Sequence, residues 1–176
     1  MKSIKINLLD LKTELNEIAS WDDKYCNDVR YRTIKQYVLE NNIYYSLREV
    51  INLNFEQYPI GDDEKHFIHS IRNEESKLIG FIISDIFDIK TNPTLFIQYL
   101  VLHPHFHSKG YGTLALNEFI TNSTKYVEHE PQEIFALIEK TNYESRALFE
   151  KFGFDFSQKE NENYFKAVKK TLTLEK

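Results

Sequence analysis

The sequence is poor in residues that cross-link or interrupt a chain. Its 176 residues include one cysteine, Cys26, together with five glycines and four prolines. A single cysteine cannot form a disulfide within the chain or supply the several thiolates of a cysteine-based metal site. The scarcity of glycine and proline predicts that most of the chain forms regular helices and strands. Hydrophobic residues make up 41% of the sequence, which excludes a disordered or collagen-like chain.

Two kinds of run are also missing. No dense cluster of lysine and arginine occurs, and acidic residues outnumber basic ones by 27 to 22, so binding to nucleic acid is not expected. The longest clean apolar run, from Leu78 to Ile83, is far too short to span a membrane. The first 21 residues carry charges throughout, which predicts that they are not a signal peptide. We therefore expect one cytoplasmic domain over residues 1–176 that binds neither nucleic acid nor membranes; a homodimer is left open.

Hydrophobic periodicity predicts an α/β domain with a mixed sheet. Alternating apolar and polar residues indicate strands, and apolar residues three or four positions apart indicate helices. In chain order, these patterns predict a short strand at Ile4 and Ile6, helices over 8–18, 31–40 and 44–57, a loop over 59–64, a strand hairpin over 67–85 with its turn at 73–77, a strand over 95–102, a helix over 111–126, a strand over 134–138, a helix over 143–152, and a closing strand pair over 154–156 and 164–168. The helix over 143–152 has a good N-cap in Asn142 and a good terminating residue in Gly153.

The connection between the strand 95–102 and the helix 111–126 is suited to bind a phosphate group. It contains Lys109, Gly110 and Gly112. Glycines let the backbone come close to an anion, and the first N–H groups of a helix point outward without acceptors inside the helix. The positive end of the helix dipole and the charge of Lys109 add to the attraction. The alternative is that the glycines only allow a tight turn between strand and helix.

A dinucleotide-binding fold is a second interpretation of the same glycines. Gly110, Gly112 and Ala115 match its glycine pattern, which in that fold lies in a short turn and is followed by several strand–helix units. Here seven residues separate Leu102 from Gly110, and after residue 139 only a short helix and a hairpin are predicted. The sequence leaves too little room for that fold.

A metal site is a third interpretation, because His103, His105 and His107 alternate along the chain. Alternation would place three imidazoles on one side of an extended segment. However, Pro104 and the approach to the phosphate loop argue against a regular strand there, and no further ligand stands at a recognisable spacing. We expect no metal ion.

Two motifs occur together, one in the phosphate loop and one at the helix 143–152. Leu102-His-Pro104 is followed by His107-Ser-Lys-Gly-Tyr-Gly112, and the second segment runs Asn142-Tyr-Glu-Ser-Arg-Ala-Leu-Phe-Glu-Lys-Phe-Gly-Phe154. They resemble the GNAT superfamily of acyl-CoA-dependent N-acetyltransferases, whose signatures are V-x-P, then Q/R-x-x-G-x-G/A, and later Asn-x-x-Ala/Ser before Leu-Tyr-Glu-Lys-x-Gly-Phe. The resemblance extends over about residues 67–156. It implies a GNAT-like α/β fold with a mixed, mostly antiparallel central sheet, splayed parallel strands and helices on both faces.

The resemblance also implies a binding site for acetyl-CoA. Backbone N–H groups from Ser108 through Thr113 would hold the pyrophosphate. The family splays the preceding strand end with a bulge, expected here around 100–102, so that the backbone of Leu102 pairs with pantetheine. The N–H of Leu100 would then stabilise the negative charge that develops on the thioester carbonyl. The residues implied to contact acetyl-CoA are Leu102, His107, Ser108, Lys109, Gly110, Tyr111, Gly112, Thr113, Asn142 and Phe149.

One of these positions has an alternative role, and two others differ from the residues that the family carries there. Asn142 would contact the pantetheine arm, or it is a plain helix cap, and one side chain can serve both purposes. His107 replaces the family's Gln or Arg, which we expect to be tolerated because the backbone does most of the phosphate binding. Phe149 stands where many members carry a tyrosine that protonates the departing thiolate. A phenyl ring cannot donate a proton, so Tyr143 on the same helix, or solvent, would have to replace it.

The general base is the least defined part of the predicted site. An amine with a pKa near ~10.4 must lose a proton before it attacks a thioester, and a carboxylate or histidine can accept that proton. The resemblance places Gln98 where aminoglycoside-modifying relatives carry an acidic residue, and an amide cannot act as a base. Glu139, at the end of the strand 134–138, is our candidate base; its other interpretation is a solvated charge at a strand end. His69 and Asp85 are further candidates.

Together these features predict an N-acetyltransferase that moves an acetyl group from acetyl-CoA to a primary amine of a small molecule or peptide. The amine would attack the thioester directly in a ternary complex, because Cys26 lies far from the motifs in the sequence. The alternative is a non-catalytic acyl-CoA-binding module, since Phe149 replaces the family's tyrosine. The acceptor pocket would come from residues 25–65 and 85–94, whose tyrosines and carboxylates suit a cationic amine or simply form core and solvated loop.

Overall fold

The protein folds around one mixed β-sheet. The computed structural model describes residues 1–10, 12–19, 21, 63–159 and 161–171. The helices expected over 31–40 and 44–57, most of the loop over 59–64, and Cys26 lie outside the described residues. Within the described part, strands and helices follow one another as the sequence predicts. The α/β class is therefore confirmed.

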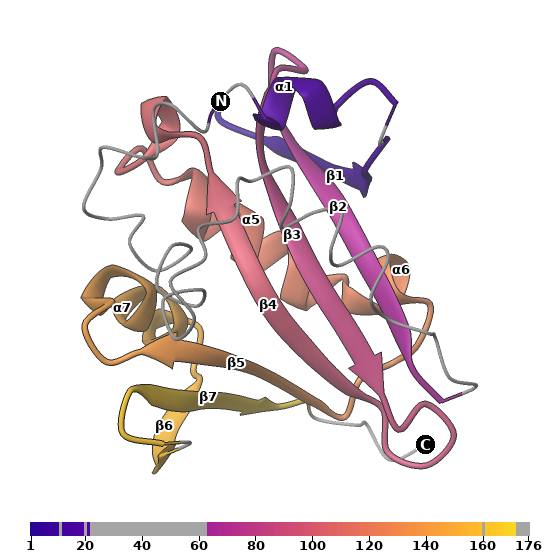
Figure 1. The fold of residues 1–176 in the computed structure, drawn as a ribbon, viewed down its shortest axis with the longest axis vertical. Coiled ribbons are helices and arrows are strands. Elements are labelled where there is room, and N and C mark those ends of the chain that lie inside the picture. The colour runs from indigo at the N-terminus through magenta and orange to yellow at the C-terminus, as the bar shows by residue number, and fades with distance from the viewer. Residues whose placement is uncertain (11, 20, 22–62, 160, 172–176) are drawn as a thin grey trace.

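In the described part of the chain, seven strands make up the sheet, in the spatial order β1-β2-β3-β4-β5-β7-β6 (Figure 1). All neighbouring strands are antiparallel except β4 and β5, which are parallel. The described elements are β1 (Ile4–Leu8), α1 (Leu15–Ala19), β2 (Lys65–Asn73), β3 (Leu78–Phe87), β4 (Thr94–Leu102), the 3-10 turn η3 (Pro104–Phe106), α5 (Tyr111–Thr121), α6 (Ser123–Val127), β5 (Glu133–Glu139), α7 (Tyr143–Lys151), β6 (Asp155–Lys159) and β7 (Tyr164–Lys170).

Two expected helices differ from the structure. Leu8 ends β1 and is exposed, so the first helix begins only at Leu15. The helix expected over 111–126 is two helices, α5 and α6, which meet at Asn122 with φ −112° and ψ 28°. The Asn122 N–H makes the last bond of α5, to the carbonyl of Glu118, and the backbone then leaves the helical conformation. The break lets α6 bring Tyr126 back against the sheet, where the centre of its ring lies 5.5 Å from the centre of the His69 ring.

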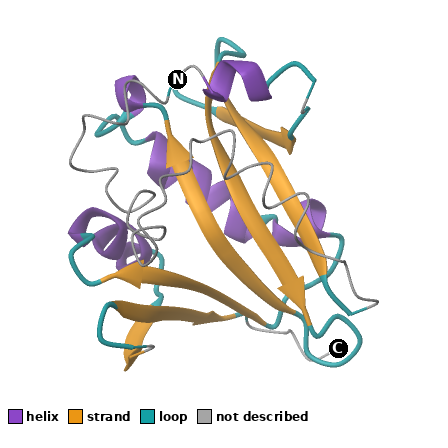
Figure 2. Cartoon of the chain, viewed as in Figure 1, coloured by secondary structure: helices purple, strands orange, loops and turns teal. Residues whose placement is uncertain are grey.

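The two faces of the sheet bury different sets of side chains. The α5 face is covered by α5 and α6, which lie behind the sheet in Figure 2; residues such as Ile82, Leu116, Phe119 and Ile134 pack there. The α1 face, turned toward the viewer, buries the smaller cluster of Leu9, Ile18, Trp21, Ile68, Leu78, Phe81, Ile83 and Val101. Helices on both faces are what the family resemblance implies. Successive strand residues alternate between the faces, so each side chain of β2 to β5 can be assigned to one of them.

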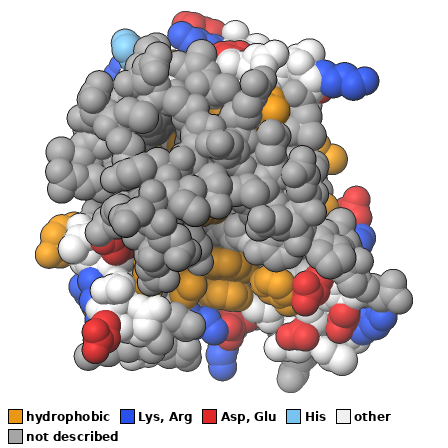
Figure 3. Space-filling view, in the orientation of Figure 1, with side chains coloured by type: hydrophobic (Ala, Val, Ile, Leu, Met, Phe, Trp, Pro, Cys, Tyr) orange, Lys and Arg blue, Asp and Glu red, His pale blue; other side chains and the backbone are white. Residues whose placement is uncertain are grey.

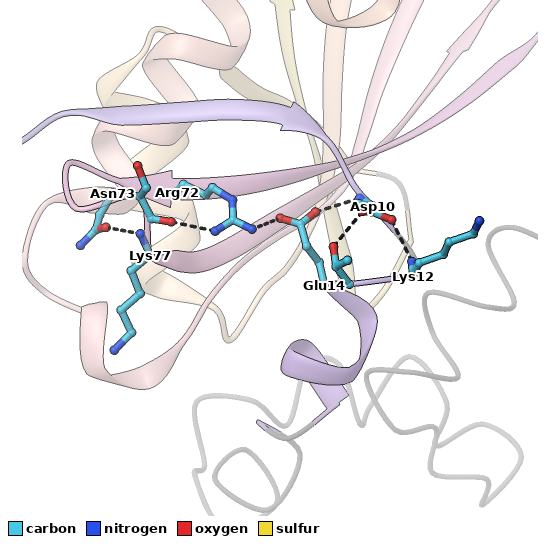
Figure 4. A network of polar contacts seen from close by, with 8 residues as sticks. Asp10, Lys12, Glu14, Arg72, Asn73 and Lys77 are labelled. Carbon is cyan, nitrogen blue, oxygen red and sulfur yellow. Dashed lines mark hydrogen bonds and ion pairs between the residues drawn. The ribbon is translucent and has the colours of Figure 1, made fainter.

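A polar network fixes α1 to the β2–β3 hairpin (Figure 4). Asp10 organises the turn that precedes α1: its carboxylate accepts from the Thr13 hydroxyl at 2.8 Å and from the Lys12 N–H at 2.9 Å. Glu14 accepts in return from the Asp10 N–H at 2.8 Å, so the two carboxylates satisfy backbone donors of this turn reciprocally. Glu14 is buried and forms an ion pair with Arg72 of β2 at 2.5 Å. The partner charge compensates for burying the carboxylate and holds α1 against the sheet.

The sheet splits between β4 and β5. The two strands pair only over Thr94–Phe96 and Glu133–Phe135. Beyond these residues β4 stays paired with β3 up to Leu102, and β5 stays paired with β7 up to Glu139. Figure 1 shows the two strands spreading apart from this point toward their carboxyl ends. The splayed parallel strands predicted from the resemblance are present, and the opening between them positions the site described next.

Candidate functional site

A tight connection leads from β4 into α5. His103 caps the turn η3, because its Nδ1 accepts from the N–H of His105 at 3.1 Å. After η3, the backbone of Ser108 and of Gly110 has positive φ, 55° and 86°. These left-handed conformations reverse the chain within a few residues. The connection therefore directs the amino end of α5 toward the opening between β4 and β5.

Backbone donors gather at the start of α5. The first bond within the helix runs from the N–H of Leu114 to the carbonyl of the residue before the helix, at 3.1 Å. The N–H groups of Tyr111, Gly112 and Thr113 consequently have no acceptor inside the helix. Residues 108–110, just before the helix, are exposed. With the dipole of an eleven-residue helix behind them, these groups can bind a phosphate.

The two glycines of the loop leave space for a ligand. A Cβ added at Gly110 would meet nothing within 4 Å, although its φ of +86° strains any L side chain. At Gly112 a Cβ would meet Leu102 and Leu148 only at 3.7 Å, an ordinary van der Waals distance. Packing inside the protein does not require glycine at position 112. The missing side chain instead leaves the amide donors accessible, so the loop fits a pyrophosphate.

The end of β4 is held by a close contact with β3. A Cβ at Gly80 would lie 2.3 Å from the carbonyl oxygen of Val101, so only glycine fits. The chain beyond β4 is also fixed, because the His103 N–H donates to the carbonyl of Ile79 at 2.8 Å. This part of β4 therefore forms a rigid wall of the opening.

The bulge in β4 lies earlier than expected. Ile83 is opposite Tyr99 and Ser84 is opposite Ile97, which leaves Gln98 as the extra residue of β4. We expected the bulge around 100–102; the register places it at Gln98, and regular pairing with β3 resumes before Leu100. A bulge bends its strand and increases the local twist. Here it lies just beyond the point where β4 and β5 part.

A polar cluster adjoins this bulge on the α1 face. Asp85 lies opposite His66 in the β2–β3 ladder, and its carboxylate contacts the Nδ1 of that ring. The amide of Gln98 donates to the other oxygen of the same carboxylate. The side chains of His66 and Asp85 are 7% and 5% exposed. Asp85 also lies opposite Phe96, the last residue of β4 that pairs with β5, so the cluster marks the closed end of the opening.

The sequence matches the model of the acetyltransferase (GNAT) family over residues 29–154. The chain belongs to the GNAT acetyltransferase family. It is an acyl-CoA-dependent acetyltransferase with acetyl-CoA as its co-substrate. Comparison with the curated proteins gives no match.

Solved structures of GNAT enzymes share the fold. The spermidine N-acetyltransferase from Vibrio cholerae in complex with CoA and spermine is 14% identical, with a TM-score of 0.65 over 96% of this chain and 95% of that one. An acetyltransferase from Thermus thermophilus is 12% identical, with a TM-score of 0.65 over 96% and 97% of the two chains. The Campylobacter jejuni N-acetyltransferase PseH is 17% identical, with a TM-score of 0.57 over 96% and 99%. At these identities the likeness concerns the fold alone.

The second GNAT motif starts with a helix cap. The side-chain oxygen of Asn142 accepts from the N–H of Ser145 at 3.0 Å, so the cap interpretation is confirmed. The cap uses only that oxygen, and the amide NH2 group keeps its capacity to donate to a ligand. Phe149 is 5% exposed and packs edge-on against Phe154 at 4.9 Å, within the core of the α5 face. Tyr143, at the start of the same helix, is 72% exposed.

Of the candidate bases, two lie on the α1 face of the sheet and one does not. Glu139 ends β5, is 9% exposed and alternates with Ile138 of the α5 face, which places it on the α1 face with Asp85. His69 lies on the α5 face instead, among Phe119, Tyr126 and Phe67. Burial lowers the pKa of His69 to about 4, although a hydrogen bond with the backbone of Tyr126 opposes the shift. His69 is therefore a neutral core residue.

The three histidines after β4 have separate roles. His103 caps η3 and packs edge-on against Trp21 at 5.2 Å, whereas the Nε2 of His107 lies 2.8 Å from the carbonyl oxygen of Leu102. His105 is exposed. Among the described residues, no three His, Cys, Asp or Glu side chains are placed to hold a metal ion. None of the described helices is long and apolar enough to span a membrane.

Two parts of the site were not identified from the sequence. His66 was not singled out, because its contact with Asp85 depends on the register of the hairpin. The turn at residues 73–77 does not give that register either, because a shift between Ile71 and Arg72 displaces the pairing by one residue. Lys2 was also missed, although its Nζ donates to the carbonyl of Lys109 at 2.7 Å. No local pattern marks a contact between residues so far apart in the chain.

Proposed function

We propose that this enzyme transfers the acetyl group of acetyl-CoA to a primary amine of a small molecule or peptide, by direct attack in a ternary complex. One observation carries the proposal: β4 and β5 part after three paired residues, and the donor-rich start of α5 follows the carboxyl end of β4. A thioester arm that enters this opening can pair with strand backbone while its phosphates bind the helix start.

The backbone of β4 is proposed to act on the thioester. Leu100 follows the bulge at Gln98, and its N–H is assigned to the carbonyl oxygen of the acetyl group. A fixed N–H donor stabilises the negative charge that develops on that oxygen during attack. Leu102 is assigned to the pantetheine arm. Its carbonyl oxygen also lies 2.8 Å from His107, and a carbonyl oxygen has two lone pairs, so it can accept from both.

The amine is proposed to approach from the α1 face. The α5 face of the opening is filled by core side chains such as Leu116, Phe119 and Ile134. On the α1 face, Figure 3 shows hydrophobic side chains over the lower part of the sheet, with acidic and basic side chains around them. Asp85 and Glu139 place two carboxylates on this face. Carboxylates attract a cationic amine, and a histidine beside one of them provides a proton acceptor.

The proposed reaction needs no covalent enzyme intermediate. From Phe96 to Leu102 and from Ile134 to Glu139, the two strands that border the opening contain no serine, threonine or cysteine. The nitrogen of the neutral amine attacks the thioester carbonyl carbon, the C–S bond breaks, and the thiolate leaves. The proton of the amine passes to Glu139 or to water, and the thiolate takes a proton from solvent, because Phe149 cannot supply one.

We further infer that residues 1–176 form a single acetyltransferase domain. The family match over residues 29–154 and the structural likeness over 96% of the chain support this inference. A polyamine is the first acceptor to test, since one structural neighbour is a spermidine N-acetyltransferase bound to CoA and spermine. Aminoglycosides, amino acids and peptide amino groups are the other classes to screen.

Calorimetric titration with acetyl-CoA, followed by thiol release in the presence of each amine, tests the proposal. We expect saturable binding that is lost in a Gly110→Glu/Gly112→Glu double variant, because two carboxylates would occupy the phosphate position. ATP and NAD serve as controls for general phosphate binding. Absence of binding at millimolar acetyl-CoA, or saturable binding without thiol release from any amine class, would contradict the proposal.

A further inference from the structure

Three lysines from distant parts of the sequence meet at the start of α5. Lys2 precedes β1, Lys77 ends the β2–β3 turn, and Lys109 belongs to the phosphate loop. The family resemblance explains only Lys109. The other two reach the loop because β1 contacts α5 and because Glu74 of the hairpin turn bonds to Tyr111, the first residue of α5.

Specific contacts hold the lysines in place. The Nζ of Lys2 donates to the carbonyl of Lys109 at 2.7 Å and lies 5.5 Å from the centre of the Tyr111 ring. The ammonium groups of Lys77 and Lys109 lie 5.6 and 5.9 Å from the centre of the Phe106 ring. The two rings are themselves 5.5 Å apart. Three cations thus surround one aromatic pair, where each is attracted by a ring face.

The acidic neighbours of this cluster do not neutralise it. Glu74 accepts from the hydroxyl of Tyr111, at 3.1 and 3.2 Å to its two oxygens. Its own backbone N–H and the hydroxyl of Tyr111 lower the pKa of Glu74, so it is charged at neutral pH. Glu75 lies in the same turn. Among the described residues, three lysines against two glutamates leave the cluster positive. The Tyr111–Glu74 bond ties the hairpin that carries Lys77 to α5.

Lysine ammonium groups are suited to a phosphate monoester. The amide donors of α5 and Lys109 already provide for a pyrophosphate. Coenzyme A carries one more anionic group, the 3′-phosphate on its ribose, and a phosphate monoester holds a charge of roughly −1.5 to −2 at pH 7. Lysine binds such a group as a mobile point charge, without the fixed geometry that arginine requires.

We propose that Lys2 and Lys77 bind the 3′-phosphate of coenzyme A beside the pyrophosphate held at the start of α5. The inference rests on the proposed function and adds a specificity to it: the enzyme distinguishes acetyl-CoA from its 3′-dephospho form. The link between Lys2 and the Lys109 carbonyl brings the first cation to the loop, and the hairpin turn brings the second.

Binding of CoA and of 3′-dephospho-CoA, measured by calorimetry at 0.05 and 0.15 M salt, tests the proposal. The variants are Lys2→Gln, Lys77→Gln and the double variant. Lys5→Gln is the matched control. It also removes one positive charge near the amino terminus, and Lys5, next to buried Ile6 in β1, is exposed. We expect the double variant to bind CoA about three- to tenfold more weakly, with unchanged affinity for 3′-dephospho-CoA and a weaker salt dependence. Lys5→Gln should match the wild type.

Two results would overturn the inference while leaving the proposed function intact. One is equal affinity of the wild type for CoA and 3′-dephospho-CoA. The other is an equal loss of both affinities in the double variant, which would assign the lysines to the pyrophosphate or to the loop structure. If the wild type binds neither compound, the proposed function fails together with the inference.

Discussion

The Nε2 atom of His107 lies 2.8 Å from the carbonyl oxygen of Leu102. This contact closes the five-residue connection between β4 and the positive-φ turn of the phosphate loop. It joins the end of β4, where Leu102 belongs to the wall of the opening, to the loop that precedes the donors of α5. We expect histidine to be tolerated here in place of the family's glutamine or arginine, because the backbone does most of the phosphate binding. Like those two side chains, the imidazole carries an N–H that can reach a carbonyl.

Removing this side chain should weaken cofactor binding. We expect His107→Ala to bind acetyl-CoA about tenfold more weakly, because the loop must then be ordered at the moment of binding. His107→Gln, which restores a side-chain N–H, should stay within about threefold of the wild type. Calorimetric titration measures both. Equal weakening in the two variants would mean that the imidazole contacts the ligand itself and does not position the loop.

Replacing Gly112 by alanine should weaken the binding of acetyl-CoA without lowering the stability of the fold. A Cβ at this position meets only contacts of 3.7 Å, and alanine favours a helix over glycine by about 1 kcal/mol. Gly112→Ala should therefore leave the melting temperature equal or slightly raised, while the affinity for acetyl-CoA falls because the methyl group stands before the amide donors.

Gly80→Ala is the contrasting variant. Its Cβ would lie 2.3 Å from the carbonyl oxygen of Val101, so β3 and β4 must shift apart. We expect destabilisation of about 1–3 kcal/mol by urea unfolding, as for other overpacked sites.

For Gly112→Ala, calorimetric titration is the deciding measurement. An unchanged affinity for acetyl-CoA would contradict the assignment of the loop before α5 to the pyrophosphate.

The sequence predicts those parts of the site that are local in the chain. The loop at Lys109–Gly112 and the capped helix after Asn142 are each contained within a dozen residues, and both are found where periodicity and turn chemistry place them. The contact between His66 and Asp85, the bulge at Gln98 and the approach of Lys2 are not local. They depend on strand register, and apolar alternation fixes which face a residue occupies but not which residue lies opposite it.

Burial was the second property that the sequence left open. His69 and Asp85 were both candidate bases on the same hairpin, yet strand alternation sends His69 to the α5 face and Asp85 to the α1 face. The choice follows from which of the two faces α5 and α6 cover. That depends on the whole packing, including the break at Asn122 that no expectation included.

Asp85 and Glu139 should affect different kinetic constants. If Asp85 attracts the cationic amine, Asp85→Asn raises KM for the amine, about tenfold for one lost charge contact of roughly 1–2 kcal/mol, with kcat and acetyl-CoA affinity little changed. If Glu139 accepts the proton, Glu139→Gln lowers kcat, by the roughly 10²–10⁴-fold typical of general-base catalysis. Steady-state kinetics of thiol release with the acceptor found in the screen separates the two.

Glu118→Gln is a suitable control for these carboxylate variants. Its side chain bonds to the hydroxyl of Tyr126 at 2.7 Å on the α5 face, away from the opening. It should leave both constants unchanged. If Asp85→Asn lowers kcat and Glu139→Gln raises only KM, the two assignments are reversed; if neither variant differs from Glu118→Gln, both are wrong.

His69 predicts a specific dependence of stability on pH. It is 1% exposed, and burial lowers the pKa of His69 from 6.5 to about 4. Between these two values the unfolded chain binds a proton that the folded chain does not. The free energy of unfolding must therefore fall as the pH decreases through this window, by about 3 kcal/mol in total, while above pH 6.5 this contribution is fully retained.

Replacing His69 by leucine removes the group that titrates and keeps an apolar side chain in its place. In urea unfolding at pH 7.5, 6.5, 5.5 and 4.5, the wild type should lose about 2.5 kcal/mol more than His69→Leu over the series, most of the full effect. Other groups, such as the Glu14–Arg72 ion pair, contribute equally to both proteins and cancel in the difference. The same slope in wild type and variant would show that His69 is protonated inside the fold at pH 5. In that case its place among Phe67, Phe119 and Tyr126 could not be as dry as the packing of their rings indicates.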